Sequence, residues 1–263
     1  MQIREEQTDL SIASRDFVTA SQVNQYYSGD GGNDANDGKS IQTRTESIDQ
    51  AVFLAKNQPS TPTSTNRISI NNVGGGSFKA FNLNGPYISV NAVDAGFYFP
   101  FTASSPDGII INAGSSADLG FITTDNALTT QAGILLKTTG GTTAVRIHAS
   151  SLFSGDGVYG NTLFQANSET VIFDCDDIRQ GGNINYKAVE VLDNVTCYIK
   201  ECKRLRGKVS VGDGAVANIE AQEFSGDVVV GSNSILWMHG YVWGTGDIIS
   251  VGTNSFIVMD FAV

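Results

Sequence analysis

The pattern Val211-Gly212-Asp213-Gly214-Ala215 decides the fold of this chain, because it recurs three more times at nearly constant intervals. In every copy, a valine that ends a strand is followed by a turn rich in Gly, Asp, Asn or Ser. The other copies are Val191-Leu192-Asp193-Asn194-Val195, Val230-Gly231-Ser232-Asn233-Ser234 and Val251-Gly252-Thr253-Asn254-Ser255. Their first residues are 20, 19 and 21 positions apart. Such a period is typical of repeat architectures, in which similar units stack on one another.

A second column of apolar residues keeps the same phase. It consists of Ile199, Ile219, Met238 and Met259. Because successive side chains of a strand point to opposite faces, these four residues are expected to point inward and their neighbours outward. Two columns with one phase therefore predict a continuous interior ladder.

This alternation predicts an all-β fold, a right-handed parallel β-helix (a solenoid). Each strand would pair with its equivalent in the next coil, and no single coil could bury its apolar face alone. Weaker copies of the pattern begin near Arg67-Ile68-Ser69-Ile70-Asn71. They predict about nine coils, which at about 4.8 Å each give a rod of about 43 Å. A leucine-rich repeat would need a Leu-x-x-Leu-x-Leu framework that is absent, and a β-sandwich would not explain the two columns.

The composition excludes several functions. The 263 residues include 16 Lys+Arg and 27 Asp+Glu, for a formal net charge of −11. This charge repels phosphate backbones, so we expect no nucleic-acid partner. We also expect no membrane insertion, because no stretch approaches the ~18 apolar residues of a span, and no signal peptide, because the N-terminus lacks an apolar core. Cys175, Cys197 and Cys202 have no metal-ligand spacing and are expected to be free thiols. We expect no cofactor.

A specific resemblance begins at Tyr26-Tyr27-Ser28. A run of Gly, Asn and Asp follows and ends in Asn36-Asp37-Gly38-Lys39-Ser40. This arrangement resembles the opening segment of pectin-lyase-like β-helix proteins, which many bacteriophage tailspikes and tail fibres carry. The resemblance covers residues 26–57 by motif and the rest of the chain by architecture alone. Where the family often has Pro-Phe, this chain has Thr43-Arg44-Thr45.

In that family the next element is a short helix that caps the open end of the solenoid. Ile48, Ala51, Val52 and Ala55 lie at helical spacing here, and Thr45 or Ser47 can supply the N-cap. A lid is needed because an uncovered coil exposes unpaired backbone groups. The expected organisation has three parts. These are an N-terminal arm that would serve as virion anchor (residues 1–25), an opening loop with its capping helix (26–66) and the β-helix (67–263).

The opening loop also suggests a metal site. Asp30, Asp34 and Asp37 resemble a calcium loop in composition, but they lack the Glu that closes an EF-hand at its twelfth position. Asp, Asn and Gly are also ordinary turn formers. We favour turn formation and expect no metal.

Surface carboxylates raise an enzymatic interpretation, because related tailspikes cleave surface polysaccharide with carboxylates on one solenoid face. Paired acids can act as general acid and base in such a hydrolase or lyase. The candidates here are Asp174, Asp176, Asp177, Glu190 and Asp193. A competing interpretation is a ladder of mixed charges that keeps one face soluble. The ladder would comprise Lys200, Glu220, His239 and Asp260, and we favour it. His148 and His239 are then expected to be surface or turn residues.

Trp237, Tyr241 and Trp243 lie within seven positions of one another. Exposed aromatic residues on a rod can stack on sugar rings, or they can form contacts between subunits, where Trp and Tyr are enriched. We favour the subunit contact.

The last residues, 256–263, lie inside a coil, which predicts an apolar end that its own chain or another copy covers. Fibrous viral proteins of the resembled family are commonly homotrimers, so the resemblance implies a homotrimer located in the virion. The first hypothesis is therefore a bacteriophage fibre, spike or decoration protein that projects from the particle and binds a host surface glycan. The alternative is a tailspike depolymerase that cleaves bacterial polysaccharide.

Overall fold

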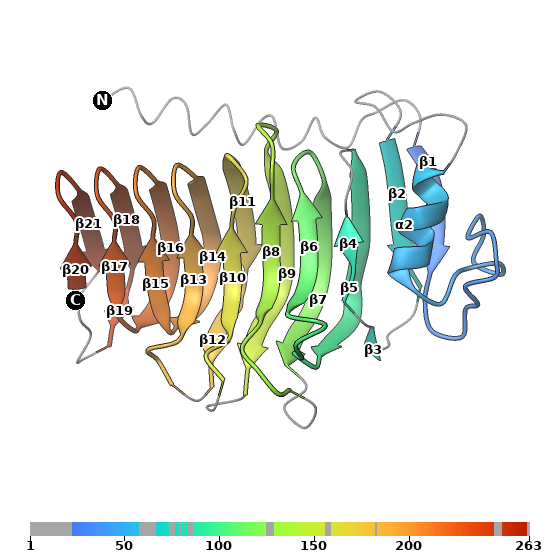
Figure 1. Cartoon of the computed structure of the whole chain (residues 1–263), viewed down its shortest axis with the longest axis horizontal. Coiled ribbons are helices and arrows are strands. Elements are labelled where there is room, and N and C mark those ends of the chain that lie inside the picture. The colour runs from blue at the N-terminus through green and yellow to red at the C-terminus, as the bar shows by residue number, and fades with distance from the viewer. Residues whose placement is uncertain are drawn as a thin grey trace.

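The computed structural model describes residues 23–57, 67–73, 77–78, 80–83, 87–124, 129–155, 159–181, 183–244 and 249–261. Apart from residues 23–25, the arm expected at residues 1–25 lies outside this description. Within the described part the chain is nearly all β, arranged as two sheets of parallel strands that run side by side along a rod (Figure 1). This confirms an all-β, parallel, solenoid-like fold.

The larger sheet has thirteen strands among the described residues. Its main path runs through β1 (Val23–Ser28), β2 (Arg67–Asn72), β5 (Ile88–Phe99), β7 (Ser116–Thr124), β9 (Val145–Ser154), β11 (Thr170–Cys175), β14 (Thr196–Arg206), β16 (Val216–Ser225), β18 (Ile235–Gly240) and β21 (Phe256–Phe261). Three short strands lie off this path: β3 (Ser77–Phe78) pairs with β5, β12 (Asp177–Gln180) pairs with both β9 and β14, and β19 (Val242–Trp243) pairs with β16.

The smaller sheet has eight described strands. In order they are β4 (Asn82–Leu83), β6 (Asp107–Asn112), β8 (Ile134–Thr139), β10 (Thr162–Ala166), β13 (Lys187–Val191), β15 (Lys208–Val211), β17 (Val228–Val230) and β20 (Ile249–Val251). Over most of its length the chain alternates between the two sheets, so each strand pairs with the equivalent strand of the preceding passage.

The two columns read from the sequence are confirmed by the strand registers. Val191 pairs with Val211, Val211 with Val230 and Val230 with Val251. In the larger sheet, Ile199, Ile219, Met238 and Met259 pair in the same consecutive way. The first three valines are almost fully buried, whereas Val251 is 47% exposed because β20 is the last strand of its sheet.

The repeated turn has a backbone cause. Asn194, Gly214, Asn233 and Asn254 stand at the same place in the four copies, and all have φ between 55° and 67°. This left-handed region is costly for most L-residues, but Gly and Asn tolerate it. The turn residues of each copy therefore suit a conformation that lets one coil stack on the next.

The predicted helix is present as α2 (Ile48–Lys56). Ser47, rather than Thr45, is its N-cap and accepts a hydrogen bond from the Gln50 amide. The four residues at helical spacing are buried, and the helix packs at the β1–β2 end of the rod (Figure 1).

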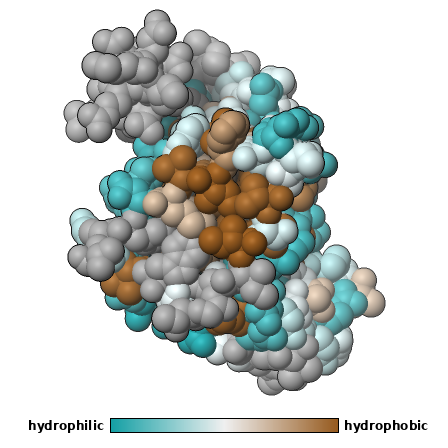
Figure 2. Space-filling model, turned by 90° about the vertical axis from the view of Figure 1, so that its left-hand side faces the viewer, coloured by the Kyte–Doolittle hydropathy of each residue, from teal (hydrophilic) through white to brown (hydrophobic). Residues whose placement is uncertain are grey.

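The opposite end of the rod carries an apolar surface. Figure 2 views this end and shows hydrophobic side chains at its centre. Ile249, Val251, Phe256 and Val258 are each 45–67% exposed.

Candidate functional site

A row of three serines forms the floor of a hollow on the outer face of the larger sheet. Ser69 on β2 pairs with Ser89 on β5, which pairs with Ser116 on β7. Serine side chains are short, so this outward column projects less from the sheet than the larger side chains in the columns on either side of it. The hollow has a volume of about 340 Å³. We call it the serine trough.

The trough has walls of different chemistry. Arg67 and Tyr87 line one side, with the guanidinium 5.9 Å from the ring centroid. Asn91 and Asp118, which pair with each other, line the other side. Tyr87 has a left-handed backbone with φ of 65°, a conformation that is strained for an aromatic residue. Backbone strain of this kind is found preferentially at functional sites.

The trough ends where the floor column changes from serine to larger side chains. Ser116 pairs with Arg146 on β9, and the next residues in the column are Ile172 and Tyr198. Arg146, His148 and Asp174 line this end of the hollow. A ligand lying on the serines would therefore meet a cluster of charged groups at one end.

The charged end is built from three strands in register. Asp118 on β7 pairs with His148 on β9, which pairs with Asp174 on β11. The His148 Nδ1 atom is 4.0 Å from the Asp118 Oδ1 atom. A histidine between two carboxylates in adjacent strands is an arrangement that can transfer protons.

Asp174 differs from an ordinary surface aspartate. Its burial, and secondarily the nearby Glu201 carboxylate, raise its pKa, while Lys200, Arg146 and His148 oppose the change. Its Oδ1 atom is buried and accepts no hydrogen bond within the described residues. This carboxyl group is therefore suited to holding a proton that it can give to a ligand.

The sequence had suggested only Asp174 of these residues. No pattern in the sequence singles out Asp118 or Arg146, and His148 is expected there to be a surface or turn residue. It does lie at the surface, but in register with two acids. No fixed period marks these residues, because successive members of the column are 26 to 30 positions apart.

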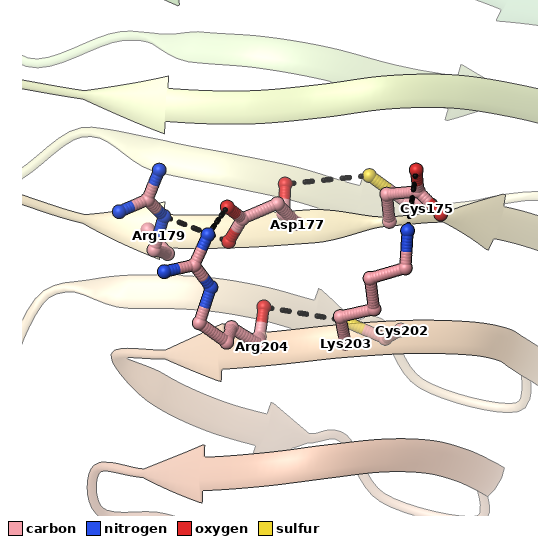
Figure 3. A network of polar contacts seen from close by, with 7 residues as sticks. Cys175, Asp177, Arg179, Cys202, Lys203 and Arg204 are labelled. Carbon is pink, nitrogen blue, oxygen red and sulfur yellow. Dashed lines mark hydrogen bonds and ion pairs between the residues drawn. The ribbon is translucent and has the colours of Figure 1, made fainter.

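Asp176 and Asp177 face different surroundings, although they are close to Asp174 in sequence. The Asp177 carboxylate is buried, 2.7 Å from Arg179 Nε and 2.9 Å from Arg204 Nη2 (Figure 3). The Arg179 contact is an ion pair without hydrogen-bond alignment. Asp176 is half-exposed and pairs with Lys203 at 3.2 Å. Both carboxylates join neighbouring coils, and neither lines the trough.

Glu190 and Asp193 lie apart from the other three candidates. Glu190 is on β13 of the smaller sheet, where it contacts Lys187 and accepts a hydrogen bond from Gln165 at 2.7 Å. Asp193 is in the repeated turn and accepts a hydrogen bond from the Asp213 amide at 2.8 Å. The five carboxylates proposed from the sequence are therefore not gathered in one site.

The expected charge ladder is present in modified form. Glu220, His239 and Asp260 pair consecutively. Lys200 does not pair with Glu220, because the register between β14 and β16 shifts between Ile199 and Cys202. On the other side of β14, Lys200 pairs with Asp174 on β11. Glu201 at this irregularity has φ of 58°.

Of the aromatic side chains Trp237 and Tyr241, Tyr241 lines a second hollow, which has a volume of about 380 Å³. Glu201, Glu220, Gln222, His239, Tyr241 and Asp260 contribute to its lining. Tyr241 is 66% exposed. In the outward column of the larger sheet, Tyr198 on β14 pairs with Asn218 on β16, and Asn218 pairs with Trp237 on β18. Trp243 pairs through its backbone with Phe224, and its side chain lies outside the described residues.

The acidic groups of the opening loop form internal hydrogen bonds. Asp34 accepts hydrogen bonds from the amide and hydroxyl of Ser47 at 2.8 and 2.9 Å. A hydrogen bond from the Thr43 hydroxyl lowers the pKa of Asp37. The Asp30 carbonyl accepts hydrogen bonds from Arg44. No His, Cys, Asp and Glu cluster suited to a metal ion occurs in the described part of the chain.

The three cysteines are free and buried, as expected. Burial raises the pKa of Cys197 and of Cys202 to about 12. A thiol is reactive as its thiolate, so these groups fill space in the core.

The chain matches no protein-family model, no curated protein and no solved structure. Of the helices in the described residues, none has the length and apolar character to cross a membrane.

Proposed function

We propose that this chain is a glycan-binding structural protein of a bacteriophage virion, a fibre, spike or decoration protein. The serine trough carries the glycan-binding part of the proposal. It is a hollow on a rigid sheet, with hydroxyl groups on its floor and an aromatic ring, an amide, charged groups and apolar side chains around it. Sites for sugars need such convergent polar groups at fixed positions.

The viral part of the proposal rests on the resemblance of residues 26–57 to the opening segment of tailspikes and tail fibres. The same resemblance supports a right-handed solenoid of about nine coils, with α2 as its cap. It also supports a homotrimer, whose three equal sites would bind a polymeric surface glycan together. Light scattering of the purified chain tests the trimer, and a single monomeric species would contradict it.

Filling the trough tests glycan binding. Ser89→Trp places a large side chain on the floor and should abolish binding to the polysaccharides of an array. Asn218→Trp is the matched control, because Asn218 occupies the same outward column outside the trough. Equal binding by both variants and the unaltered chain would refute the trough as the site.

A depolymerase is the second candidate, and the position of Asp174 favours it. Asp118 and Asp174 are two strands apart, so their backbones are about 9.6 Å apart at about 4.8 Å per strand. Inverting glycosidases hold their two carboxyl groups about 6.5–9.5 Å apart, so the two side chains would have to lean slightly toward each other. In this mechanism Asp174 would give its proton to the departing glycosidic oxygen. Asp118 would take a proton from the water that attacks the anomeric carbon.

A further inference from the structure

We propose that the serine trough selects acidic glycans, and that Arg146 binds the carboxylate of a sugar in it. This inference rests on the proposed glycan-binding function and specifies its ligand class. It makes the charged end of the trough the part that distinguishes one glycan from another.

The first support is the state of Arg146 itself. Its side chain is half-buried at the end of the serine column and lines the hollow. Its guanidinium forms no hydrogen bond or ion pair with any described residue, and its recorded interaction is a Coulombic one with Asp174. A guanidinium carries five N–H donors in a planar fork. Because no described residue occupies these donors, they can bind an anionic ligand that lies in the hollow.

Three other arginines of the chain have a described polar partner. Arg44 donates hydrogen bonds to the carbonyl oxygens of Asp30 and Ile41. Arg179 and Arg204 flank the carboxylate of Asp177. Arg146 is the exception among these four, and it is also the one that lines the trough.

The second support is the position of Arg146 relative to the floor. Ser116 precedes it in the same column on the adjacent strand, about 4.8 Å away along the rod. A sugar ring that hydrogen-bonds to the serine hydroxyls would thus bring an attached carboxylate within reach of the fork. Arginine and carboxylate form two parallel hydrogen bonds in such a geometry.

The neighbouring carboxylates do not cancel this preference. Asp118 and Asp174 belong to the adjacent column rather than to the floor. Burial raises the pKa of Asp174, so this group takes up a proton at a higher pH than an ordinary aspartate. Mild acidification should therefore strengthen binding of an acidic glycan.

The test uses an array of bacterial polysaccharides that contains acidic (uronic or sialic acid) and neutral members. The unaltered chain should bind acidic members. Chemical reduction of their carboxylates to alcohols should weaken binding about ten- to a hundredfold, the range expected for charge-assisted hydrogen bonds. Arg146→Gln should lose a similar factor on the native glycan and bind native and reduced forms equally.

Arg206→Gln is the matched control, since Arg206 is exposed and lies outside the trough. Normal binding of Arg146→Gln, or a preference for neutral or only phosphate-bearing glycans, would overturn the inference while leaving glycan binding in place. Absence of binding to every member of the array would overturn the proposed function as well. A circular dichroism spectrum of each variant confirms that it is folded.

Discussion

Asp177 on β12 lies 2.9 Å from Arg204 on the neighbouring strand β14, so a buried carboxylate joins two successive coils. Its side chain is only 11% exposed and has Arg179 as a second partner. The Arg204 guanidinium donates a hydrogen bond to the Asp177 carboxylate, and a charge-assisted hydrogen bond of this kind is directional. The contact thus helps to set the register of β12 against β14.

Asp177→Asn should destabilise the chain. Loss of the carboxylate leaves two guanidinium groups without their buried partner, and because both are partly exposed we expect a cost of about 1–3 kcal/mol in the free energy of unfolding. Urea denaturation measures it. Asp176→Asn is the matched control, because the exposed Asp176–Lys203 pair should contribute less than about 1 kcal/mol. Equal effects of both substitutions would contradict a structural role for Asp177.

The turn conformation gives a second prediction. Asn233 has φ of 57°, so Asn233→Ala should cost about 1–2 kcal/mol, the penalty of the left-handed region for a residue with a Cβ. Asn233→Gly should be close to neutral, since glycine adopts this region freely and stands at the equivalent position 214. Thermal unfolding compares the variants. An alanine variant as stable as the glycine variant would show that the turn tolerates another backbone conformation.

Asp174 makes stability depend on pH. Its pKa is raised by burial above the usual value of 3.8, so between 3.8 and the raised value the folded chain binds more protons than the unfolded chain. The free energy of unfolding therefore falls as pH rises through this window, and the ionised group is a penalty above it. Asp174→Asn should raise the midpoint temperature of unfolding at pH 7, and this gain should shrink as the pH falls toward 3.8. If the gain in midpoint temperature grew as the pH fell, the raised pKa of Asp174 would be contradicted.

The depolymerase candidate is tested by product analysis. Incubation with host capsular polysaccharide or lipopolysaccharide should release new reducing ends if the chain is a hydrolase. Asp118→Ala and Asp174→Ala should each reduce that release by at least about a hundredfold, the contribution expected of a general acid or base. Asp193→Ala, in a turn outside the trough, serves as the control. Binding without shortening of the polysaccharide would leave the adhesive function and exclude the hydrolytic one.

The sequence determined the repeating part of the rod. The valine column and the Ile199–Ile219–Met238–Met259 column could be read directly, because coils of nearly constant length keep equivalent residues in phase. The helix could also be read, since its buried residues and its cap are local signals. Toward the N-terminus the inward column continues at Phe173, which pairs with Ile199.

Only the tertiary structure decided the site. Ser69, Ser89 and Ser116 are 20 and 27 positions apart, and Asp118, His148 and Asp174 are 30 and 26 apart. Loops of unequal length separate them, so no period in the sequence aligns them. They meet because parallel strands pair by backbone hydrogen bonds and by the packing of their inward side chains. The outward residues that form the trough are carried into register by that pairing.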